Sequence, residues 1–487
     1  MTLANEETSP SRRQIAGQGM LLFSGFGAAQ MLSFVRNALV GHALSKGDFG
    51  IAAAITITLQ MVETLSDLGS DRMIMQARDG DTPRFLAASH LLLAVRGAVL
   101  AVIQFVAAPF VAAAFGAAHA ATAFQIAALV PLIKGFMHLD FRIAQRNFDN
   151  RPQLLVDVLP QAAALLATWP LLMIVRDYSA VVALSCAQAL AATLLSHVLA
   201  RRPYRLAVDA DIFIRQLQFG WPILASALPL VAVYQGDRMI IAHFAGVEQL
   251  ANYTAAFMVT MVPALIAAKV GHALMLPLFA GSVRRGQSLQ SKFRVAGESA
   301  VVMAAIYLAG FIVCGGAVLP LIFGAHYGDL GAVVGWLAAM WALRMIQSAP
   351  GMALMAHGET KPFLIAGVIR AAALPVVGYA AANGSPLMTL AAIGCAFEAL
   401  SLVYIAGRLE VLERGLGVIL ASRTAFMAPA ALLALLSAQA SPPGTLCLVA
   451  TAAGVVAVLA ASALAVMPSL NALVRRAIRS KTHASAI

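Results

Sequence analysis

The strongest constraint in the sequence is a succession of apolar stretches, each about 20 residues long, the length that a helix needs to cross a bilayer core. They are predicted at 15–43, 49–75, 84–114, 120–141, 153–175, 179–200, 212–243, 249–279, 295–322, 330–356, 363–382, 387–407, 418–438 and 445–467. Only 11% of the 487 residues are charged, and the mean hydropathy is +0.83, far above the soluble range. We therefore predict an all-α polytopic membrane protein with about fourteen transmembrane helices.

The stretches form two sets of six and a final pair. We expect a cytoplasmic tail at 1–14, an N-terminal lobe at 15–200, a linker at 201–211, a C-terminal lobe at 212–407, a helix pair at 408–467 and a second cytoplasmic tail at 468–487. Lys134–Pro152 aligns with Arg344–Pro362 without a gap, and Arg36 aligns with Arg238 after one gap. The two lobes are then a parallel pseudo-twofold repeat, although chance similarity of two apolar hairpins is a second interpretation.

The Lys and Arg residues outside the predicted spans lie almost entirely on one side. The opposite loops hold only Lys46 and Arg176. Because positive residues gather on the cytoplasmic side, both termini are predicted to be cytoplasmic. This topology explains most of the net charge of +11, so no nucleic-acid partner is predicted.

Several classes of protein are disfavoured by missing features. Cys186, Cys314, Cys395 and Cys447 occur singly, with no spacing that predicts a metal site. The chain contains no phosphate-binding GxxxxGK[ST] loop, no HExxH and no GxSxG. A membrane glycosyltransferase or polymerase would need a sizeable outer loop, and the predicted loops are short. We expect a transporter rather than an enzyme, without a cofactor.

Apart from arginines at the cytoplasmic ends of the predicted spans, seven cations lie within them: Arg36, Arg96, Lys134, Arg238, Lys269, Arg344 and Arg370. Each would cost about 2.5–3.5 kcal/mol at the bilayer centre if it faced lipid. Lys134, Arg344 and Arg370 lie near mid-span, where they predict either an interior anion site or pairing with carboxylates. Arg238 and Lys269 lie nearer the helix ends and can equally reach a headgroup.

Acidic residues also occur within the spans. Thr56, Gln60, Glu63, Asp67 and Asp71 recur at steps of three or four, which predicts one polar face of the second helix. Glu398 stands alone in the twelfth span. Glu63, Asp67 and Glu398 are candidates for binding H⁺ or Na⁺ during transport. In the alternative interpretation they only neutralise nearby cations.

The segment from Val35 to Gln76, VRNALVGHALSKGDFGIAAAITITLQMVETLSDLGSDRMIMQ, resembles the Wzx-type polysaccharide or O-antigen flippases of the multidrug/oligosaccharidyl-lipid/polysaccharide (MOP) exporter superfamily. The similar features are Arg36 late in the first helix, the turn at Asp48-Phe49-Gly50, and Asp67-Leu68-Gly69 near the end of the second helix. Ser45-Lys46-Gly47 departs from the family pattern, where Gly-Pro is common. The layout of two six-helix lobes and a final helix pair also agrees.

The resemblance implies export of an undecaprenyl-diphosphate-linked oligosaccharide across the bacterial inner membrane, for lipopolysaccharide or exopolysaccharide synthesis. Related members alternate access through a cationic central cavity, and Arg36 matches a basic position of the family. By depth alone, we predict that Arg96, Lys134, Arg344 and Arg370 also bind the anionic headgroup. Expected partners are this lipid-linked oligosaccharide, membrane lipids and other polysaccharide-assembly proteins.

Two other functions in the superfamily compete with this one. A multidrug and toxin exporter would carry organic cations and would need an acidic, aromatic-rich cavity, whereas the chain is only 7% aromatic. A lipid II flippase would also have fourteen helices and a basic cavity, and stays an open alternative.

Overall fold

The computed structural model describes residues 12–440, 445–469 and 471–472, and every regular element within these ranges is a helix. The chain divides into two compact units, Met1–Val231 and Ala232–Ile487. The division falls inside helix α10 (Ala210–Ala245), whose first part belongs to the first unit. The predicted tails at 1–14 and 468–487 lie mostly outside the described residues.

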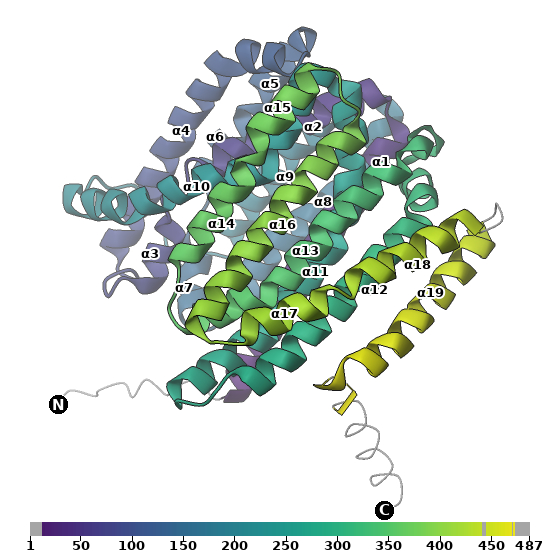
Figure 1. Cartoon of the computed structure of the whole chain (residues 1–487). Helices are drawn as coiled ribbons and strands as arrows, with labels where there is room; N and C mark the ends of the chain where they lie inside the picture. Colours follow the sequence, from purple (N-terminus) through teal and green to yellow (C-terminus); the bar gives the residue numbers. More distant parts are fainter. Residues whose placement is uncertain (1–11, 441–444, 470, 473–487) are drawn as a thin grey trace, which may run out of the picture. The chain divides into compact units, whose positions relative to one another are not determined.

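The first unit combines long helices with shorter ones (Figure 1). Before α10 it contains α1 (Arg12–Ala43), α2 (Lys46–Thr64), α3 (Ser70–Gln76), α4 (Pro83–Ala114), η1 (Ala118–Ala120), α5 (Ala121–Ala127), α6 (Leu129–Gly135), α7 (Asp140–Arg146), α8 (Arg151–Ile174) and α9 (Ser179–Val198). α1 packs against α8, α8 against α9, and α4 against α5 and α6. Buried side chains that include Ile74, Phe85 and Ile212 form a core between α3, α4 and the start of α10.

Helices α4 and α6 touch through their backbones. A Cβ atom at Gly97 would lie 2.6 Å from the carbonyl oxygen of Pro131 and 2.8 Å from the Cα of Gly135. Only hydrogen fits there, which is the way small residues let membrane helices pack closely. The contact holds α6, which carries Lys134, directly against α4.

The second unit is built around α13. After α10 it contains α11 (Val247–Arg284), α12 (Gln290–Phe323), η2 (Ala325–Leu330), α13 (Gly331–Ala356), α14 (Lys361–Ala371), α15 (Ala373–Ala382), α16 (Leu387–Leu412), α17 (Leu416–Thr424), α18 (Met427–Ala440) and α19 (Thr445–Val466). α13 packs against α11, α12 and α16, and half of its most apolar stretch is buried inside the protein. The final helices α18 and α19 lie along α12 (Figure 1), where Ala305, Ala434 and Leu459 share a buried core.

The helices agree with the predicted apolar stretches in their order along the chain. Among the described residues, eleven helices are long and apolar enough to cross a membrane, or up to twelve if a bent pair is counted as one span. The prediction of an all-α, multi-pass membrane protein is confirmed. The count of fourteen spans stays a prediction.

The second predicted helix, 49–75, is wrong as one continuous element. α2 ends at Thr64, and α3 starts at Ser70 after a break. Gly69 has a φ of +64°, and its N–H donates to Oδ1 of Asp67 at 2.9 Å. A left-handed glycine ends the helical path, and the Asp67 side chain stabilises the turn. Asp67 therefore lies in the break, and Asp71 belongs to another helix than Glu63.

Other predicted spans are bent or broken as well. The stretch 120–141 contains α5, α6 and the start of α7, with a bend of 55° between the segments Ala118–Gly135 and Asp140–Arg146. The stretch 363–382 is divided into α14 and α15, and 418–438 into α17 and α18. Apolar composition therefore locates a span without showing where its axis changes direction.

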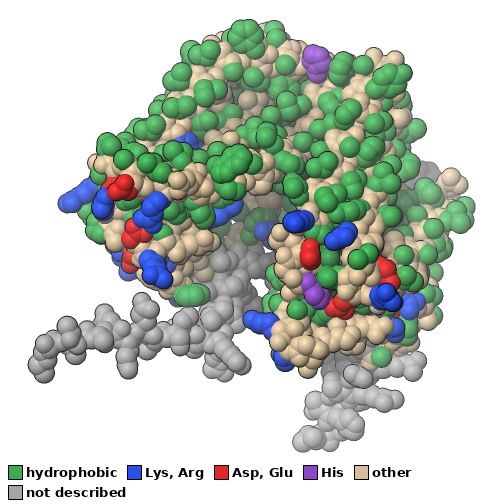
Figure 2. Space-filling view, turned by 60° about the vertical axis from the view of Figure 1, so that its left-hand side comes forward, with side chains coloured by type: hydrophobic (Ala, Val, Ile, Leu, Met, Phe, Trp, Pro, Cys, Tyr) green, Lys and Arg blue, Asp and Glu red, His purple; other side chains and the backbone are tan. Residues whose placement is uncertain are grey.

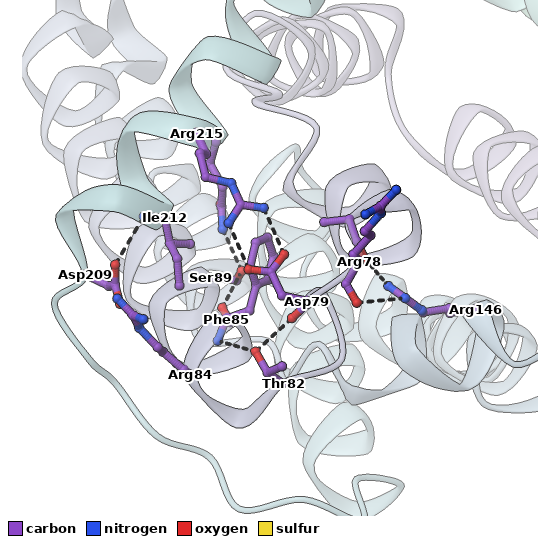
Figure 3. A network of polar contacts seen from close by, with 12 residues as sticks. Arg78, Asp79, Thr82, Arg84, Phe85, Ser89, Arg146, Asp209, Ile212 and Arg215 are labelled. Atoms are coloured by element: carbon purple, nitrogen blue, oxygen red, sulfur yellow. Dashed lines mark hydrogen bonds and ion pairs between the residues drawn. The ribbon is translucent and has the colours of Figure 1, made fainter. Parts of the chain in front are cut away.

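The start of α10 and the adjacent Asp209 are held to the first unit by ion pairs (Figure 3). Arg215 donates through both Nη atoms to the carboxylate of Asp79 at 2.8 Å, and Arg84 pairs with Asp209. These hydrogen bonds from arginine lower the pKa of Asp79 and Asp209. Arg146 donates to the backbone carbonyls of Ile74, Ala77 and Arg78. The start of α10 therefore belongs to the first unit by direct contacts.

On the face drawn in Figure 2, charged side chains gather in small groups, and hydrophobic side chains are spread over the rest of the face. Along α4, the exposed side chains of Val99, Ile103, Val106 and Phe110 recur every three or four residues. One side of this helix is thus suited to contact with lipid.

Candidate functional site

In the first unit, polar side chains meet at the end of α2. Lys134 on α6 places its Nζ 3.0 Å from both carboxylate oxygens of Glu63. The side chains are 38% and 61% exposed, respectively, so the pair is open to its surroundings. Arg96 on α4 donates from Nη2 to the Glu63 carbonyl oxygen at 3.2 Å and to Ser66 Oγ at 2.9 Å. Two cations therefore converge on the negative end of the α2 dipole.

A second polar chain follows in the same unit. Arg142 on α7 pairs with Asp71 on α3 and donates to Gln153 Oε1 at 2.6 Å. Gln153, on α8, donates in turn to Asp157. The sequence analysis did not single out Arg142, which directly follows the predicted span 120–141. The bend before α7, which turns this residue toward α3 and α8, has no signature in the apolar pattern.

The other predicted residues of the first unit have different partners. Arg36 on α1 donates to Gln188 on α9, and Asp67 forms a longer contact with Arg72, 3.5 Å between Oδ2 and Nη2. Asp67 also holds the Gly69 turn. Glu63, Arg96 and Lys134 thus form one cluster. Arg36 makes its contact on a separate pair of helices.

In the second unit, one carboxylate joins two arginines from different helices. Glu398 on α16 is 1% exposed; its Oε2 lies 2.8 Å from Nε of Arg344 on α13, and its Oε1 lies 3.0 Å from Nε of Arg370 on α14. The predicted residues Arg344 and Arg370 are therefore brought together by a third predicted residue. We call Arg344, Arg370 and Glu398 the arginine–glutamate triad.

Aromatic side chains surround the Arg344 guanidinium. Its Cζ lies 4.6 Å from the ring centroid of Trp341 and 5.2 Å from that of Tyr234. These cation–π contacts hold the guanidinium in place and replace part of its lost hydration. The triad therefore combines a fixed position with a formal charge of +1, counted as two guanidinium groups and one carboxylate.

The turn of α10 that carries Tyr234 also carries Asp237 and Arg238. Asp237 accepts from the hydroxyl of Tyr253 at 2.6 Å and from the backbone N–H of Arg238 at 2.8 Å. Arg238 is 7% exposed, donates to the Tyr234 carbonyl oxygen at 2.6 Å and lies over the ring of Phe257. Arg238 is thus enclosed by protein and does not extend to a headgroup.

The alignment of the two halves also matches two residues that each contact an arginine. The register that carries Lys134 onto Arg344 also carries Gln188, the partner of Arg36, onto Glu398, the partner of Arg344. Both positions lie within an arginine contact of their own unit. A neutral amide in one half and a carboxylate in the other make the two sites electrostatically different.

Both clusters are built from ion pairs between basic and acidic side chains. Within the described ranges, no group of three or more His, Cys, Asp and Glu side chains is arranged to hold a metal ion. Guanidinium groups bind carboxylates and phosphates through two parallel hydrogen bonds. The triad can therefore exchange a carboxylate partner for another oxyanion.

Comparison with known proteins identifies a family. A family profile described as "Polysaccharide biosynthesis protein" matches residues 40–331, more than half of the chain. A search among curated protein sequences finds no match.

Solved structures share the fold at low sequence identity. The chain is similar to the lipid II flippase MurJ in an inward closed conformation, with a TM-score of 0.71 and 10% identity over 90% of this chain and 98% of that one. It is also similar to an inward-facing multidrug resistance MATE transporter of the MOP superfamily, with a TM-score of 0.65 and 15% identity over 79% and 96%. A MOP superfamily transporter from Pyrococcus furiosus, whose binding pocket is described as of reverse polarity, gives 0.52 and 15% over 82% and 96%.

Proposed function

The chain belongs to the polysaccharide biosynthesis protein family, and from this premise we propose that it flips an undecaprenyl-diphosphate-linked oligosaccharide across the bacterial inner membrane. The direction is from the inner to the outer leaflet, with both chain termini in the cytoplasm. The fold shared with MOP transporters supports transport by alternating access. The lipid tail stays in the bilayer while the charged headgroup passes through the protein.

One observation carries the proposal: two arginines share a single carboxylate in the apolar interior of the second unit. Arg344 and Arg370 are 13% and 23% exposed, and among the residues that the structure describes only Glu398 forms an ion pair with them. Buried charges in a membrane are costly, and where they occur they commonly mark a binding or transport site. A diphosphate supplies the oxygens and the negative charge that this arrangement lacks.

The first unit supplies further contacts in the proposal. Lys134 and Arg96 are also proposed to bind the anionic headgroup, because the Glu63–Lys134 pair is open to its surroundings. Arg36 binds outside the Glu63 cluster, on the face between α1 and α9. Partners other than lipid are the proteins that assemble the polysaccharide, which receive the exported headgroup.

Transport in this direction needs little or no additional energy. Moving one negative charge outward across an inside-negative membrane releases about 2.3 kcal/mol per 100 mV. Glu63, Asp67 and Glu398 remain the candidates for H⁺ or Na⁺ coupling. Of these, Glu63 is the most favourable, because its side chain is 61% exposed and can exchange an ion, whereas that of Glu398 is 1% exposed.

The two competing functions make different demands on these residues. Export of organic cations requires an acid that is free to bind them, and Glu63 and Glu398 are each paired with a base. A lipid II flippase would use the same diphosphate chemistry. The two flippases are distinguished by complementation. If the chain flips lipid II, it should restore growth to a strain that lacks its lipid II flippase. If it flips a lipid-linked oligosaccharide, it should restore only surface polysaccharide in a strain that lacks the polysaccharide flippase.

The decisive experiment combines a deletion of the gene with variants of the triad. Lipid-linked oligosaccharide that is accessible to a membrane-impermeant periplasmic label would be measured in cells that express the wild type or Arg344→Ala/Arg370→Ala. Each charged hydrogen bond contributes about 1.5–3 kcal/mol, so we expect a loss of export of about 100-fold or more.

A matched control removes an arginine of the same unit from the surface. Arg294 on α12 is exposed, and Arg294→Ala should export at the wild-type rate. Normal export by a double variant present in the membrane at wild-type abundance would refute the proposed role of the triad.

A further inference from the structure

Glu398 has an arrangement that a purely structural counter-ion does not need. Its Oε2 accepts a hydrogen bond from Nε of Arg344 at 2.8 Å, whereas its Oε1 lies 3.0 Å from Nε of Arg370 in an ion pair that is not a hydrogen bond. Nη1 of Arg344 is buried and has no hydrogen-bond partner. The carboxylate thus neutralises part of the charge but leaves hydrogen-bonding capacity unused on Arg344. A phosphate has more oxygen acceptors and more charge than a carboxylate.

The Arg344 guanidinium is fixed independently of Glu398. The rings of Trp341 and Tyr234 both face it, and Trp341 is 2% exposed. If the carboxylate moved away, Arg344 would keep its position. An incoming oxyanion would find a preorganised donor, which lowers the ordering cost of binding.

When no substrate is bound, the two arginines need a counter-charge. Without a carboxylate, two guanidinium groups from α13 and α14 would face each other in a largely buried setting. Asp237 lies on the turn of α10 whose Tyr234 faces Arg344. Its carboxylate already accepts hydrogen bonds from the Tyr253 hydroxyl at 2.6 Å and from the Arg238 N–H at 2.8 Å. Glu398 is the acid whose oxygens reach both guanidinium groups.

We propose that Glu398 is an exchangeable stand-in for the substrate phosphate: it neutralises Arg344 and Arg370 while the site is empty, and a phosphate of the headgroup displaces it during loading. This inference rests on the proposed function. Glu398 is then a positioning residue that sets the affinity for the anion by competing with it. The exchange lets the loaded and the empty protein both change conformation without two uncompensated cations.

The test measures binding of inorganic pyrophosphate to the purified full-length protein in nanodiscs of phosphatidylcholine, by isothermal titration calorimetry. Glu398→Gln keeps the size of the side chain but removes the competing charge. We expect Glu398→Gln to bind pyrophosphate about tenfold more tightly, which corresponds to one charged hydrogen bond. Its export rate in cells should fall, because the empty site is left with unpaired arginines.

Glu298 provides a matched control in the same unit. It is also fully buried, and it lies 3.5 Å from Arg423. Glu298→Gln removes a buried acid from an arginine without touching the triad, so its pyrophosphate affinity should equal that of the wild type. Glu398→Asp, which keeps the charge on a shorter side chain, should bind with an affinity between those of the wild type and Glu398→Gln.

The outcomes separate this inference from the proposed function. Equal or weaker pyrophosphate binding by both Glu398→Gln and Glu398→Asp would overturn the stand-in role. If Glu398→Gln cannot be purified, the Glu398→Asp measurement decides alone, and an affinity no higher than that of the wild type overturns it. Unchanged pyrophosphate binding by Arg344→Ala/Arg370→Ala would instead show that the triad is not the anion site, which defeats the proposed function of these arginines.

Discussion

The imidazole rings of His90 and His138 lie edge to face, with their centroids 4.7 Å apart, and each ring holds one backbone carbonyl of the segment 199–209. His90 Nδ1 lies 3.2 Å from the carbonyl oxygen of Arg205, and His138 Nε2 lies 3.0 Å from that of Arg202. The second nitrogen of each ring accepts a backbone N–H, from Leu139 and Asp140 respectively. Both rings are thus arranged as neutral imidazoles with opposite tautomers.

Replacing these rings should loosen the segment. His90→Ala leaves the Arg205 carbonyl oxygen and the Leu139 N–H without their partner, and each unsatisfied buried group costs about 1–3 kcal/mol. We expect faster hydrogen exchange at Ala207, whose N–H donates to Ala87 O at 3.3 Å. The readout is exchange mass spectrometry. His119→Ala, at an exposed histidine of the same unit, should leave the rate unchanged; equal protection of Ala207 in both variants would contradict the prediction.

Acidification should release the same segment by a second route. Hydrogen bonds from Arg215 and Arg84 depress the pKa of Asp79 and Asp209 in the folded protein. A depressed pKa means that the stabilisation is present above the unfolded value, about 3.9 for Asp, and is lost as the pH falls through the folded value. Exchange protection of 199–209 should therefore decrease below about pH 4.

The carboxylates themselves supply the control for this pH effect. Asp79→Asn and Asp209→Asn carry no titrating acid at these positions, so their protection should be lower at neutral pH and flatter on acidification. The Arg215–Asp79 pair is about half exposed and Arg84 is largely exposed beside Asp209, so water screens both pairs and the effect should also weaken in high salt. If the double variant Asp79→Asn/Asp209→Asn lost exchange protection with pH as the wild type does, other groups would control the segment.

The close approach of α4 and α6 predicts a strong effect of one methyl group. Gly97→Ala places a Cβ 2.6 Å from the Pro131 carbonyl oxygen, so the two helices must separate. Overpacking of this kind typically costs about 1–3 kcal/mol. The melting temperature in detergent should fall relative to that of Gly378→Ala, because a Cβ at Gly378 has nothing within 4 Å. Equal melting temperatures would mean that the helices adapt without strain.

The sequence predicts where apolar segments lie but not how they are broken or rotated. The start of α4 is a local property of the sequence, because a capping hydroxyl and an early proline act within one turn: Thr82 Oγ1 accepts from Phe85 N–H at 3.2 Å, and Pro83 is the first residue of the helix. The break at Asp67-Leu68-Gly69 depends on a left-handed glycine, which no apolar period reveals.

Which residues form each ion pair could not be predicted, for a related reason. Glu398 meets arginines from α13 and α14, and which faces of three helices meet depends on their packing. Depth within a span did select Arg344 and Arg370 as candidates, because the midpoint of an apolar run is a local property. It could not show that Lys134 pairs with Glu63 in the first unit.

Exchanging the charges of Lys134 and Glu63 tests whether their pair is only structural. The side chains are 38% and 61% exposed, so the pair contributes about 1 kcal/mol or less to stability, and the variants should fold. If Lys134 contacts the anionic headgroup, Lys134→Met should reduce export several-fold. The exchange Lys134→Glu/Glu63→Lys should not restore it, because the positive charge then sits on α2 instead of α6.

A purely structural pair predicts the reverse pattern. Lys134→Met and Glu63→Gln would then lose stability and export together, and the exchanged pair would recover both. Export through periplasmic labelling and melting temperature should therefore be measured on the wild type, Lys134→Met, Glu63→Gln and the exchanged pair. Glu63→Gln also tests whether Glu63 couples export to an ion gradient. If Glu63 exchanges an ion, this variant should keep its melting temperature, and its export should no longer respond to an imposed H⁺ or Na⁺ gradient. Recovery of wild-type export by the exchanged pair would rule out a headgroup contact at Lys134.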